Sequence, residues 1–463
     1  MNKLSNSITN DLFAIWKAGV DGVDPQRLIR ENLAFNFETQ SLEIQELCLP
    51  INGIGKIVVL GAGKASGKMG VAVEDILLPH FGRSRLCGWI NVPDDCVEPT
   101  EAIHLHGARP TGINEPTAES VRGTDEILNL LRNMQPNDLC IFLISGGGSA
   151  LLSAPVPRIS LNEKTELIRF LSTAGANIEQ INTVRKQLSR VKGGGILKLC
   201  PTQNLVSLIL SDVLGDPLDV IASGPTVENS TTVVDALAVL DIFLKTDHQR
   251  NGFQNVLDYL TKKRGNAEKI TSFGHNIIIG NNAVAVDAAG VEAEKRGYSH
   301  AMISAQKSEG SAESVGKHLA GMLGSMICDG PNCLITGGEP TVSLPEISIR
   351  GKGGRNQQLI LAALIHFLRN APGGFDLNRP LPFAMLSGGT DGEDGPTDAA
   401  GAYFDESILR NIIHSGLDPL DFLSRCDAYD FFKKTGGLLI TGPTGTNVCD
   451  IRVVVVRNEP LTI

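Results

Sequence analysis

The chain runs Leu139-Cys-Ile-Phe-Leu-Ile-Ser-Gly-Gly-Gly-Ser149, an apolar stretch that ends in three glycines flanked by serines. The apolar residues predict a strand that is buried on both faces, as in a parallel sheet. A loop with so few side chains lets backbone N–H groups approach an oxyanion closely, typically a phosphate at the start of a helix. The residues that we expect to bind a phosphate-bearing cofactor here are Ser145, Gly146, Gly147, Gly148 and Ser149.

A strand followed by a glycine turn occurs three more times. The apolar runs are residues 57–60, 333–336 and 384–387, and glycines follow directly at 61, 337 and 388. Glycine clustered after strands, rather than in repeats, argues against collagen-like or low-complexity structure. Four such turns predict a site that holds a polyanion.

The spacing of the strands predicts two α/β domains. Strands at 57–60, 87–92, 139–144 and 205–210 are separated by long helical connections, which is typical of a doubly wound, Rossmann-like parallel sheet. A second series follows at 277–280, 300–304, 333–336, 384–387, 437–441 and 449–456, with a buried helix at 359–368. We place the domains at 1–235 and 236–463, with the junction inside a mostly helical segment, 230–270. The first 35 or so residues predict an amphipathic helix that can pack on either domain.

The composition and charge of the chain limit the kinds of partner that it can bind. The 463 residues carry a formal net charge of -10 without a basic stripe, which disfavours nucleic acid and anionic membranes. The nine cysteines are scattered and form no Cys-x-x-Cys pair, which is typical of reduced thiols rather than of disulfides or a zinc site. No apolar run approaches the length of a membrane span, and the first residues lack the apolar core of a signal peptide. We expect a soluble, cytoplasmic enzyme.

The turn Gly61-Ala-Gly-Lys-Ala-Ser-Gly67 fits two familiar motifs incompletely. As a dinucleotide fingerprint it has one residue too many before the last glycine, although Asp94 follows the next strand where a ribose-binding acid can sit. As a Walker A loop it has Met69 where a magnesium-binding hydroxyl belongs. Both interpretations ignore Lys64, a flexible cation beside open backbone at Gly61 and Gly63 that suits a phosphate or a carboxylate.

Charged residues at other turns complete the candidate site. Asp212 is placed just after a strand, where α/β proteins bind ligands. The loop with Asp391 and Asp394 has enough carboxylates to hold Mg²⁺, although Asp394 is equally suited to capping a turn. Arg185 and Lys186 are adjacent on a helix, so only one of them can face the site. We expect Arg185 to bind the cofactor and the other cation to be solvated. Arg355 opens the buried helix after a flexible loop and is placed as a bidentate anion clamp.

Six of these segments, in this order, resemble the glycerate 2-kinase family, the two-domain type whose C-terminal part is called the MOFRL domain. They are Gly61-Ala-Gly-Lys-Ala65, Ser145-Gly-Gly-Gly-Ser-Ala-Leu-Leu152, Asn182-Thr-Val-Arg-Lys186, Ser211-Asp212 with Ala222-Ser-Gly-Pro-Thr226, Gly351-Lys-Gly-Gly-Arg-Asn356, and Gly389-Thr-Asp-Gly392 with Asp394-Gly-Pro-Thr-Asp-Ala399. Together they span nearly the whole chain, which makes the resemblance far more specific than any one motif.

The resemblance implies ATP- and Mg²⁺-dependent phosphorylation of D-glycerate to 2-phosphoglycerate, with the active site in the cleft between a Rossmann-like domain and a MOFRL-type mixed α/β domain. It implies catalytic roles for Lys64, Asp212, Arg355 and Asp391, with Asp391 and Asp394 as metal ligands. The resemblance does not decide whether Asp212 or Asp391 orients the attacking hydroxyl. It also does not decide whether the protein forms a homodimer. The alternative is a nicotinamide-dependent hydroxypyruvate reductase, which leaves the acidic loop and Arg355 with little to do.

Overall fold

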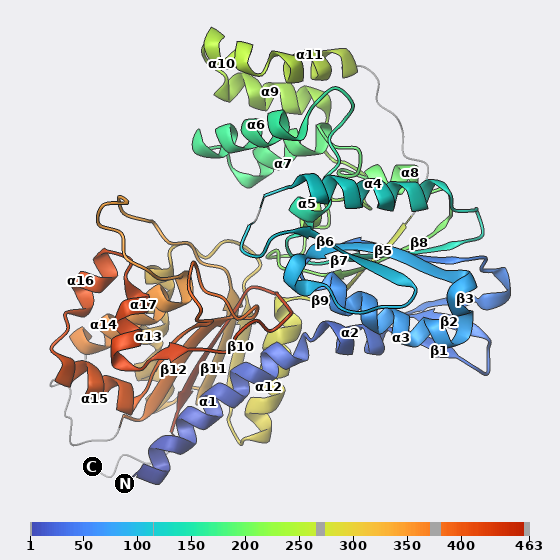
Figure 1. The fold of residues 1–463 in the computed structure, drawn as a ribbon. Coiled ribbons are helices and arrows are strands. Elements are labelled where there is room, and N and C mark those ends of the chain that lie inside the picture. The colour runs from blue at the N-terminus through green and yellow to red at the C-terminus, as the bar shows by residue number, and fades with distance from the viewer. Residues whose placement is uncertain (1, 114, 265–273, 371–380, 458–463) are drawn as a thin grey trace. The chain divides into compact units, whose positions relative to one another are not determined.

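The computed structural model describes residues 2–113, 115–264, 274–370 and 381–457, with side chains from residue 8 onward. The chain divides into two compact units (Figure 1). The first unit is Pro25–Ile279, and the second combines Met1–Asp24 with Gly280–Ile463. Both units have an α/β architecture, as the sequence predicts.

The first unit is built on a six-stranded sheet with the order β6-β5-β4-β7-β8-β9. Its strands are β4 (Ile57–Ala62), β5 (Leu86–Pro93), β6 (Ile103–Arg109), β7 (Leu139–Ile144), β8 (Asn204–Leu210) and β9 (Gly274–Gly280). The registered pairs from β6 to β8 are all parallel. In order of sequence this is 3-2-1-4-5-6, the strand order of the Rossmann fold. The prediction of a doubly wound parallel sheet is therefore confirmed.

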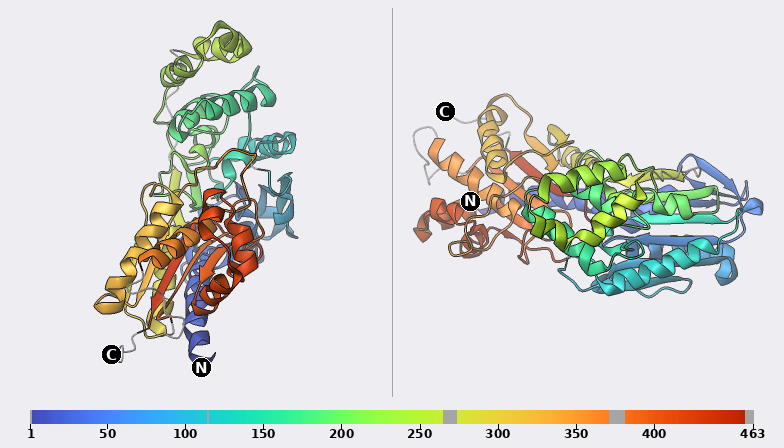
Figure 2. Two further views of the ribbon diagram at one scale, coloured as in Figure 1. Left: turned by 90° about the vertical axis from the view of Figure 1, so that its left-hand side faces the viewer. Right: turned by 90° about the horizontal axis from the view of Figure 1, so that it is seen from above.

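Helices cover both faces of this sheet (Figure 1, Figure 2). Successive residues of a strand point to opposite faces. The Ile90 side chain of β5 packs against Gly70 of α3 (Ser66–Arg85), and the next side chain, Asn91, packs against Gly123 of α4 (Ala118–Arg132). The helices α3 and α4 therefore cover opposite faces. The unit also contains the short helices α2 (Pro25–Asn32), α5 (Gly148–Leu151) and α8 (Gly195–Leu199), and a small antiparallel sheet of β1 (Leu33–Asn36), β2 (Ser41–Ile44) and β3 (Leu47–Pro50).

A helical layer with its own apolar core completes the first unit. It consists of α6 (Leu161–Thr173), α7 (Ile178–Gln187), α9 (Val233–Phe243), α10 (Asp247–Gly252) and α11 (Gln254–Lys263). Leu167, Val184, Leu240 and Leu260 are fully buried in one cluster of this layer. Because α9 packs with α7, the chain cannot divide at residue 235 without splitting that core, and the division instead lies after Ile279.

The second unit contains a mixed sheet with the order β10-β11-β15-β12-β13-β14. The strands are β10 (His300–Ser304), β11 (Cys333–Gly338), β12 (Phe383–Gly389), β13 (Gly401–Phe404), β14 (Leu438–Leu439) and β15 (Asp450–Val456). Only β10 and β11 pair in parallel, while the other pairs are antiparallel. The last strand, β15, lies between β11 and β12, near the centre of the sheet.

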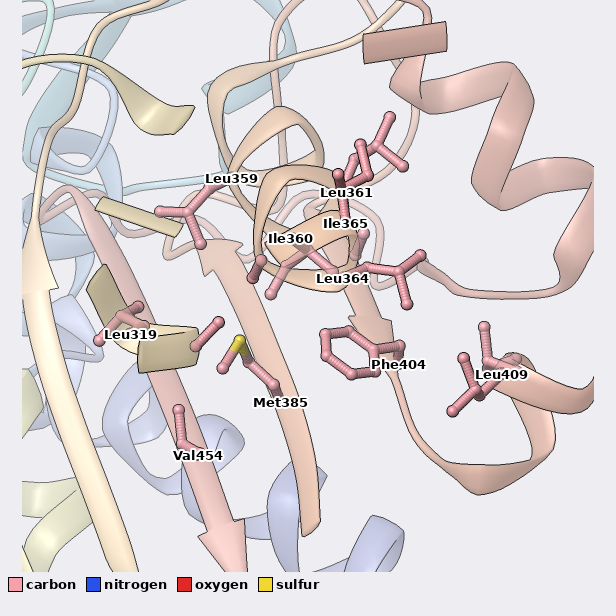
Figure 3. Close-up of a cluster of buried hydrophobic side chains, with 14 of the residues drawn as sticks. Leu319, Leu359, Ile360, Leu361, Leu364, Ile365, Met385, Phe404, Leu409 and Val454 are labelled. Atoms are coloured by element: carbon pink, nitrogen blue, oxygen red, sulfur yellow. The ribbon is translucent and has the colours of Figure 1, made fainter. Parts of the chain in front are cut away.

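Two groups of helices cover this mixed sheet. The Ile451 side chain of β15 packs against Gly19 of α1 (Asn2–Gly22). Val454 is an odd number of residues further along the strand, so its side chain points to the opposite face. On that face the core includes Leu319, Leu359, Met385, Phe404 and Val454 (Figure 3). The helices are α1 and α12 (Asn282–Lys295) on one side, and α13 (Ala312–Cys328), α14 (Arg355–Asn370), α15 (Glu406–Ser415), α16 (Pro419–Ser424) and α17 (Ala428–Thr435) on the other.

The structure departs from the sequence-based arrangement at several strands, among them β1, β2 and β3, which the sequence analysis did not predict. The run at 277–280 joins the sheet of the first unit as β9, rather than starting the second series. The strands β6 and β13 were not expected, because His104 and His106 interrupt the apolar pattern of β6 and β13 has only four residues. The N-terminal helix α1 packs within the second unit. Among the described helices, none has the length and apolar character that a membrane crossing requires.

Candidate active site

The strand order of the first unit reverses between β4 and β7. The glycine turn that contains Lys64 follows β4, and the loop from Ser145 to Ser149 follows β7. In open α/β sheets, ligands bind outside the carboxyl ends of the strands at such a switch point. The two loops are joined, because the Lys64 backbone N–H donates to Gly146 O at 2.8 Å and the Ala65 N–H donates to Ser145 Oγ at 3.0 Å. Lys64 and the glycine loop therefore lie together, as predicted.

Two glycines at this point cannot be replaced without moving their neighbours. Gly63 has φ of +154°, and a Cβ there would lie 2.0 Å from Ser145 Oγ. Gly147 has φ of +77°, a left-handed conformation, and a Cβ there would approach Arg109 Nη2 at 3.1 Å and Lys64 Cγ at 3.6 Å. The close approach means that two cationic side chains lie at the same glycine turn.

Arg109 is a site residue that sequence reasoning missed. It ends β6 and is only 3% exposed. Burial lowers the pKa of Arg109, while the neighbouring Cys96 and Asp95 act to raise it. No motif marks this arginine, because it becomes a neighbour of the glycine loop only when β6 takes its place at the edge of the parallel sheet.

A chain of polar contacts leads from the glycine loop to the helical layer. Ser149 Oγ lies 3.0 Å from Ser223 Oγ, and Ser223 Oγ donates to Asn182 Oδ1 at 3.3 Å. Arg185 Nη1 donates to the same Asn182 oxygen at 2.8 Å. Lys192 Nζ donates to Ser149 O and Oγ at 2.6 and 2.8 Å. Ser149 and Arg185 are thus brought together, and Lys192 is a further cation that the sequence did not single out.

The backbone around Ser223 is strained. Ala222, Ser223 and Gly224 have φ values of 50°, 64° and 62°, three successive residues in the left-handed region. Strain of this kind in residues other than glycine costs free energy and concentrates at functional sites. It is held by two backbone hydrogen bonds, from Gly193 N to Ser223 O and from Gly194 N to Gly224 O. The strained turn fixes the Ser223 hydroxyl between Ser149 and Asn182.

The adjacent cations Arg185 and Lys186 point in different directions, as expected. Lys186 pairs with Asp219 at 3.2 Å and its side chain is only 3% exposed, so the expectation that the second cation is solvated was wrong. The physical reason is that Asp219, which is itself partly exposed, supplies a carboxylate partner for the buried Lys186 ammonium group. Asp212 lies two residues beyond the end of β8 and is half-buried, at the same edge of the sheet as the glycine loops.

In the second unit, Arg355 begins α14, but carboxylates of the protein itself hold its guanidinium group. Nε and Nη2 donate to the two oxygens of Asp450 at 2.7 and 2.9 Å, and Nη1 donates to Glu339 at 2.8 Å. Burial acts to lower the pKa of Arg355, but Asp450 and Glu339 raise it beyond its ordinary value. Arg355 therefore makes the bidentate contact that the sequence predicts, but its partner is the carboxylate of Asp450 rather than an anion of a ligand.

Asp394 anchors the start of α14. Its Oδ1 and Oδ2 accept the backbone N–H groups of Asn356 and Gln357 at 3.0 and 2.9 Å. Burial raises the pKa of this carboxyl to about 7, although the two N–H donors act to lower it. Asp394 therefore caps the start of α14, which lies earlier in the chain, rather than a turn of its own loop, and its role as a metal ligand stays a prediction.

Asp391 lies in the turn after β12, where its Oδ1 accepts the Glu393 N–H at 3.2 Å and its carbonyl oxygen accepts the Thr444 N–H. It is close enough to Glu339 to raise the pKa of that carboxyl, after the larger effect of burial. Among the described residues, no group of three or more potential metal ligands is assembled. Mg²⁺ commonly takes only one or two protein carboxylates together with substrate phosphates, and Asp391 fits that smaller share.

Comparisons with known proteins place the chain in a family. Residues 11–260 match the model of a domain of unknown function, DUF4147, and residues 332–450 match the MOFRL family. A glycerate kinase of Danio rerio is 32% identical, with 98% of this chain and 99% of the relative covered. A D-glycerate 2-kinase of Thermotoga maritima is 34% identical over 94% of this chain and 95% of the relative.

A solved structure agrees with these relatives. The crystal structure of the glycerate kinase from Thermotoga maritima superposes with a TM-score of 0.79 at 32% sequence identity, covering 98% of this chain and 100% of that one. The chain belongs to the glycerate kinase family and has a MOFRL domain in its C-terminal part.

Proposed function

We propose that this protein transfers a phosphoryl group from ATP to the 2-hydroxyl of D-glycerate. The observation that carries the proposal is the switch point of the first unit, where Lys64 and Arg109 adjoin the triple-glycine loop. Phosphoryl transfer needs positioning and charge neutralisation more than covalent chemistry, and cations beside open backbone meet that need. A relative named D-glycerate 2-kinase supports the choice of substrate and hydroxyl. The names of the relatives do not favour the reductase alternative.

The residues take roles that follow from their chemistry. Lys64, with the N–H groups of the loop from Ser145 to Ser149, would neutralise and orient phosphate oxygens. Asp391 would hold Mg²⁺, which neutralises charge on the phosphates when it is bound. Asp212 would accept a hydrogen bond from the attacking hydroxyl, the role of an orienting base. Arg355 would stabilise negative charge that develops during transfer, with Asp450 and Glu339 holding its orientation.

A direct assay tests this function. The purified protein is incubated with ATP, Mg²⁺ and D-glycerate, and the position of the phosphate in the product is determined by ³¹P and ¹³C NMR. We expect 2-phosphoglycerate, and we expect negligible NADH oxidation with hydroxypyruvate in a parallel reaction. Hydride transfer without ATP turnover, or phosphate on the 3-hydroxyl, would contradict the proposal.

The substitutions Asp212→Asn and Asp391→Asn should separate the two acidic roles. Weakening a metal ligand raises the Mg²⁺ concentration at half-maximal rate, whereas weakening an orienting base lowers kcat at saturating Mg²⁺. We therefore expect Asp391→Asn to change the metal dependence and Asp212→Asn to change kcat. Asp421→Asn, on the exposed surface of α16, is the matched control. If both variants keep the parental rate and metal dependence, the two loops serve only as turns.

A further inference from the structure

Three cationic side chains lie near one another inside the first unit, and within the described residues none of them pairs with a carboxylate. Lys164 lies on α6, Arg185 on α7 and Lys192 in the loop that follows α7. Lys164 and Lys192 are each 3% exposed, and Arg185 is half-buried. We refer to these three residues as the cation cluster.

The partners of the cation cluster are neutral. Lys192 donates to oxygens of Ser149, and Arg185 donates to the Asn182 side chain. Lys164 Nζ has no hydrogen-bond partner among the described residues. No hydrogen bond or ion pair within the described part of the chain connects any of the three cations to a carboxylate.

Two other buried or half-buried cations of this unit have a carboxylate partner. Lys186, next to Arg185 in the chain, pairs with Asp219, and Arg190 pairs with Asp125 at 2.6 Å. In the cluster, burial lowers the pKa of Lys192 well below its ordinary value, and the charges of Lys164 and Arg185 lower it further. Burial likewise lowers the pKa of Lys164, to about 7, with a further contribution from Arg185. Burial without a counter-charge disfavours the charged form of a lysine, and the lowered pKa values express this cost.

The cation cluster adjoins the proposed active site. Ser149, which accepts two hydrogen bonds from Lys192, is the last residue of the glycine loop at the switch point. The strained turn at Ser223 connects the same serine to Asn182 and Arg185. Because Arg185 is the partly exposed member, an anion would reach the cluster from its side.

We propose that Lys164, Arg185 and Lys192 form an oxyanion subsite, in which a carboxylate or phosphate group supplies the negative charge that the fold omits. Lys164 is a positioning residue in this subsite, because it favours the anion through its charge. The identity of the natural anion rests on the proposed function, since D-glycerate carries a carboxylate and ATP carries phosphates. The existence of the subsite does not depend on that function.

Calorimetric titration of the full chain with inorganic phosphate tests the subsite. Lys164→Met removes the charge and keeps much of the apolar stem. We expect phosphate to bind about tenfold more weakly or worse, the usual effect of losing an interaction with a charged group. Lys263→Met is the matched control, because Lys263 is half-buried in the helical layer and, among the described residues, its hydrogen bonds go to Gln187. We expect the control to bind phosphate like the parent.

Thermal unfolding without ligand distinguishes a binding role from a structural one. Replacing an unpaired buried cation by an apolar side chain relieves its desolvation, so Lys164→Met should unfold at a higher temperature than the parent. If Lys164 instead supported the fold, the variant would unfold at a lower temperature and keep its affinity for phosphate, and the proposal would fall.

Two further titrations distinguish the sources of the anion. D-glycerate alone and an unreactive ATP analogue alone are each compared between the parent and Lys164→Met. Weaker binding of D-glycerate assigns the subsite to the carboxylate, and weaker binding of the analogue assigns it to a phosphate. Unchanged affinity for both compounds and for phosphate would overturn the proposal. A parent that binds phosphate through Lys164 but phosphorylates no glycerate would instead refute the proposed function alone.

Discussion

Replacing Arg355 by alanine is expected to lower the free energy of unfolding by about 3–5 kcal/mol, because it leaves a buried carboxylate without its cation. Asp450 is completely buried, and both of its oxygens accept hydrogen bonds from Arg355. From the sequence alone, an arginine after a glycine loop should be replaceable without loss of the fold. The measurement is urea unfolding of the full chain, followed by circular dichroism.

Three further variants serve as controls for the Arg355→Ala prediction. Arg169→Ala removes an arginine of α6 that pairs with Glu115 on the surface, and such surface pairs contribute little to stability. Arg355→Lys keeps the charge but loses the planar fork, so it should fold while its kcat/KM falls. Adding Asp450→Asn to Arg355→Ala should restore part of the lost stability, because the uncompensated charge disappears. Equal stability of Arg355→Ala and the parent would contradict the role of the pair with Asp450.

The strands that carry the switch point are the part of the fold that the sequence predicts best. Strand β7 has the predicted bounds, 139–144, and β4 extends the predicted run by two residues. Both strands are buried on both faces, so their apolar character is continuous and their ends are marked by glycine. The same pattern placed Lys64 and the residues from Ser145 to Ser149 next to one another.

Other elements depend on partners that are distant in the sequence. The run at 277–280 has the same apolar character whichever sheet it joins, and tertiary pairing places it beside β8. The helix α1 is amphipathic, but nothing in its pattern says that its partners are α12 and β15, more than 250 residues away. Periodicity gives the type of an element and its buried face, but not the identity of the surface that it meets.

The charged residues show the same limit. Lys164 lies in an ordinary capped helix, where a lysine is normally solvated, and only the fold reveals that it is buried beside two other cations. Arg355 was recognised because a glycine-rich loop precedes it, but its partner Asp450 is 95 residues later in the chain. A single sequence therefore indicates which loops can bind an anion, while the counter-charges of individual side chains follow only from the tertiary structure.

Lys64→Ala is expected to lower kcat/KM by about 10²-fold or more, the scale for losing a donor directed at developing charge. Stability should change little, because the backbone holds this loop: the Lys64 N–H donates to Gly146 O, and the next residue donates to Ser145 Oγ. Alanine keeps both of these N–H groups. The measurements are a coupled assay with ATP, Mg²⁺ and D-glycerate, and urea unfolding of the same preparation.

The matched control for Lys64→Ala is Lys56→Ala, which removes an exposed lysine just before β4, at the opposite end of the strand that leads to Lys64. Its activity should equal that of the parent, because ligands of an open α/β sheet bind at the carboxyl ends of the strands. A loss confined to Lys64→Ala, with unchanged unfolding, would assign the effect to the side-chain cation at the switch point. A folded Lys64→Ala variant with parental activity would mean that Arg109 and the backbone N–H groups neutralise the phosphates without it.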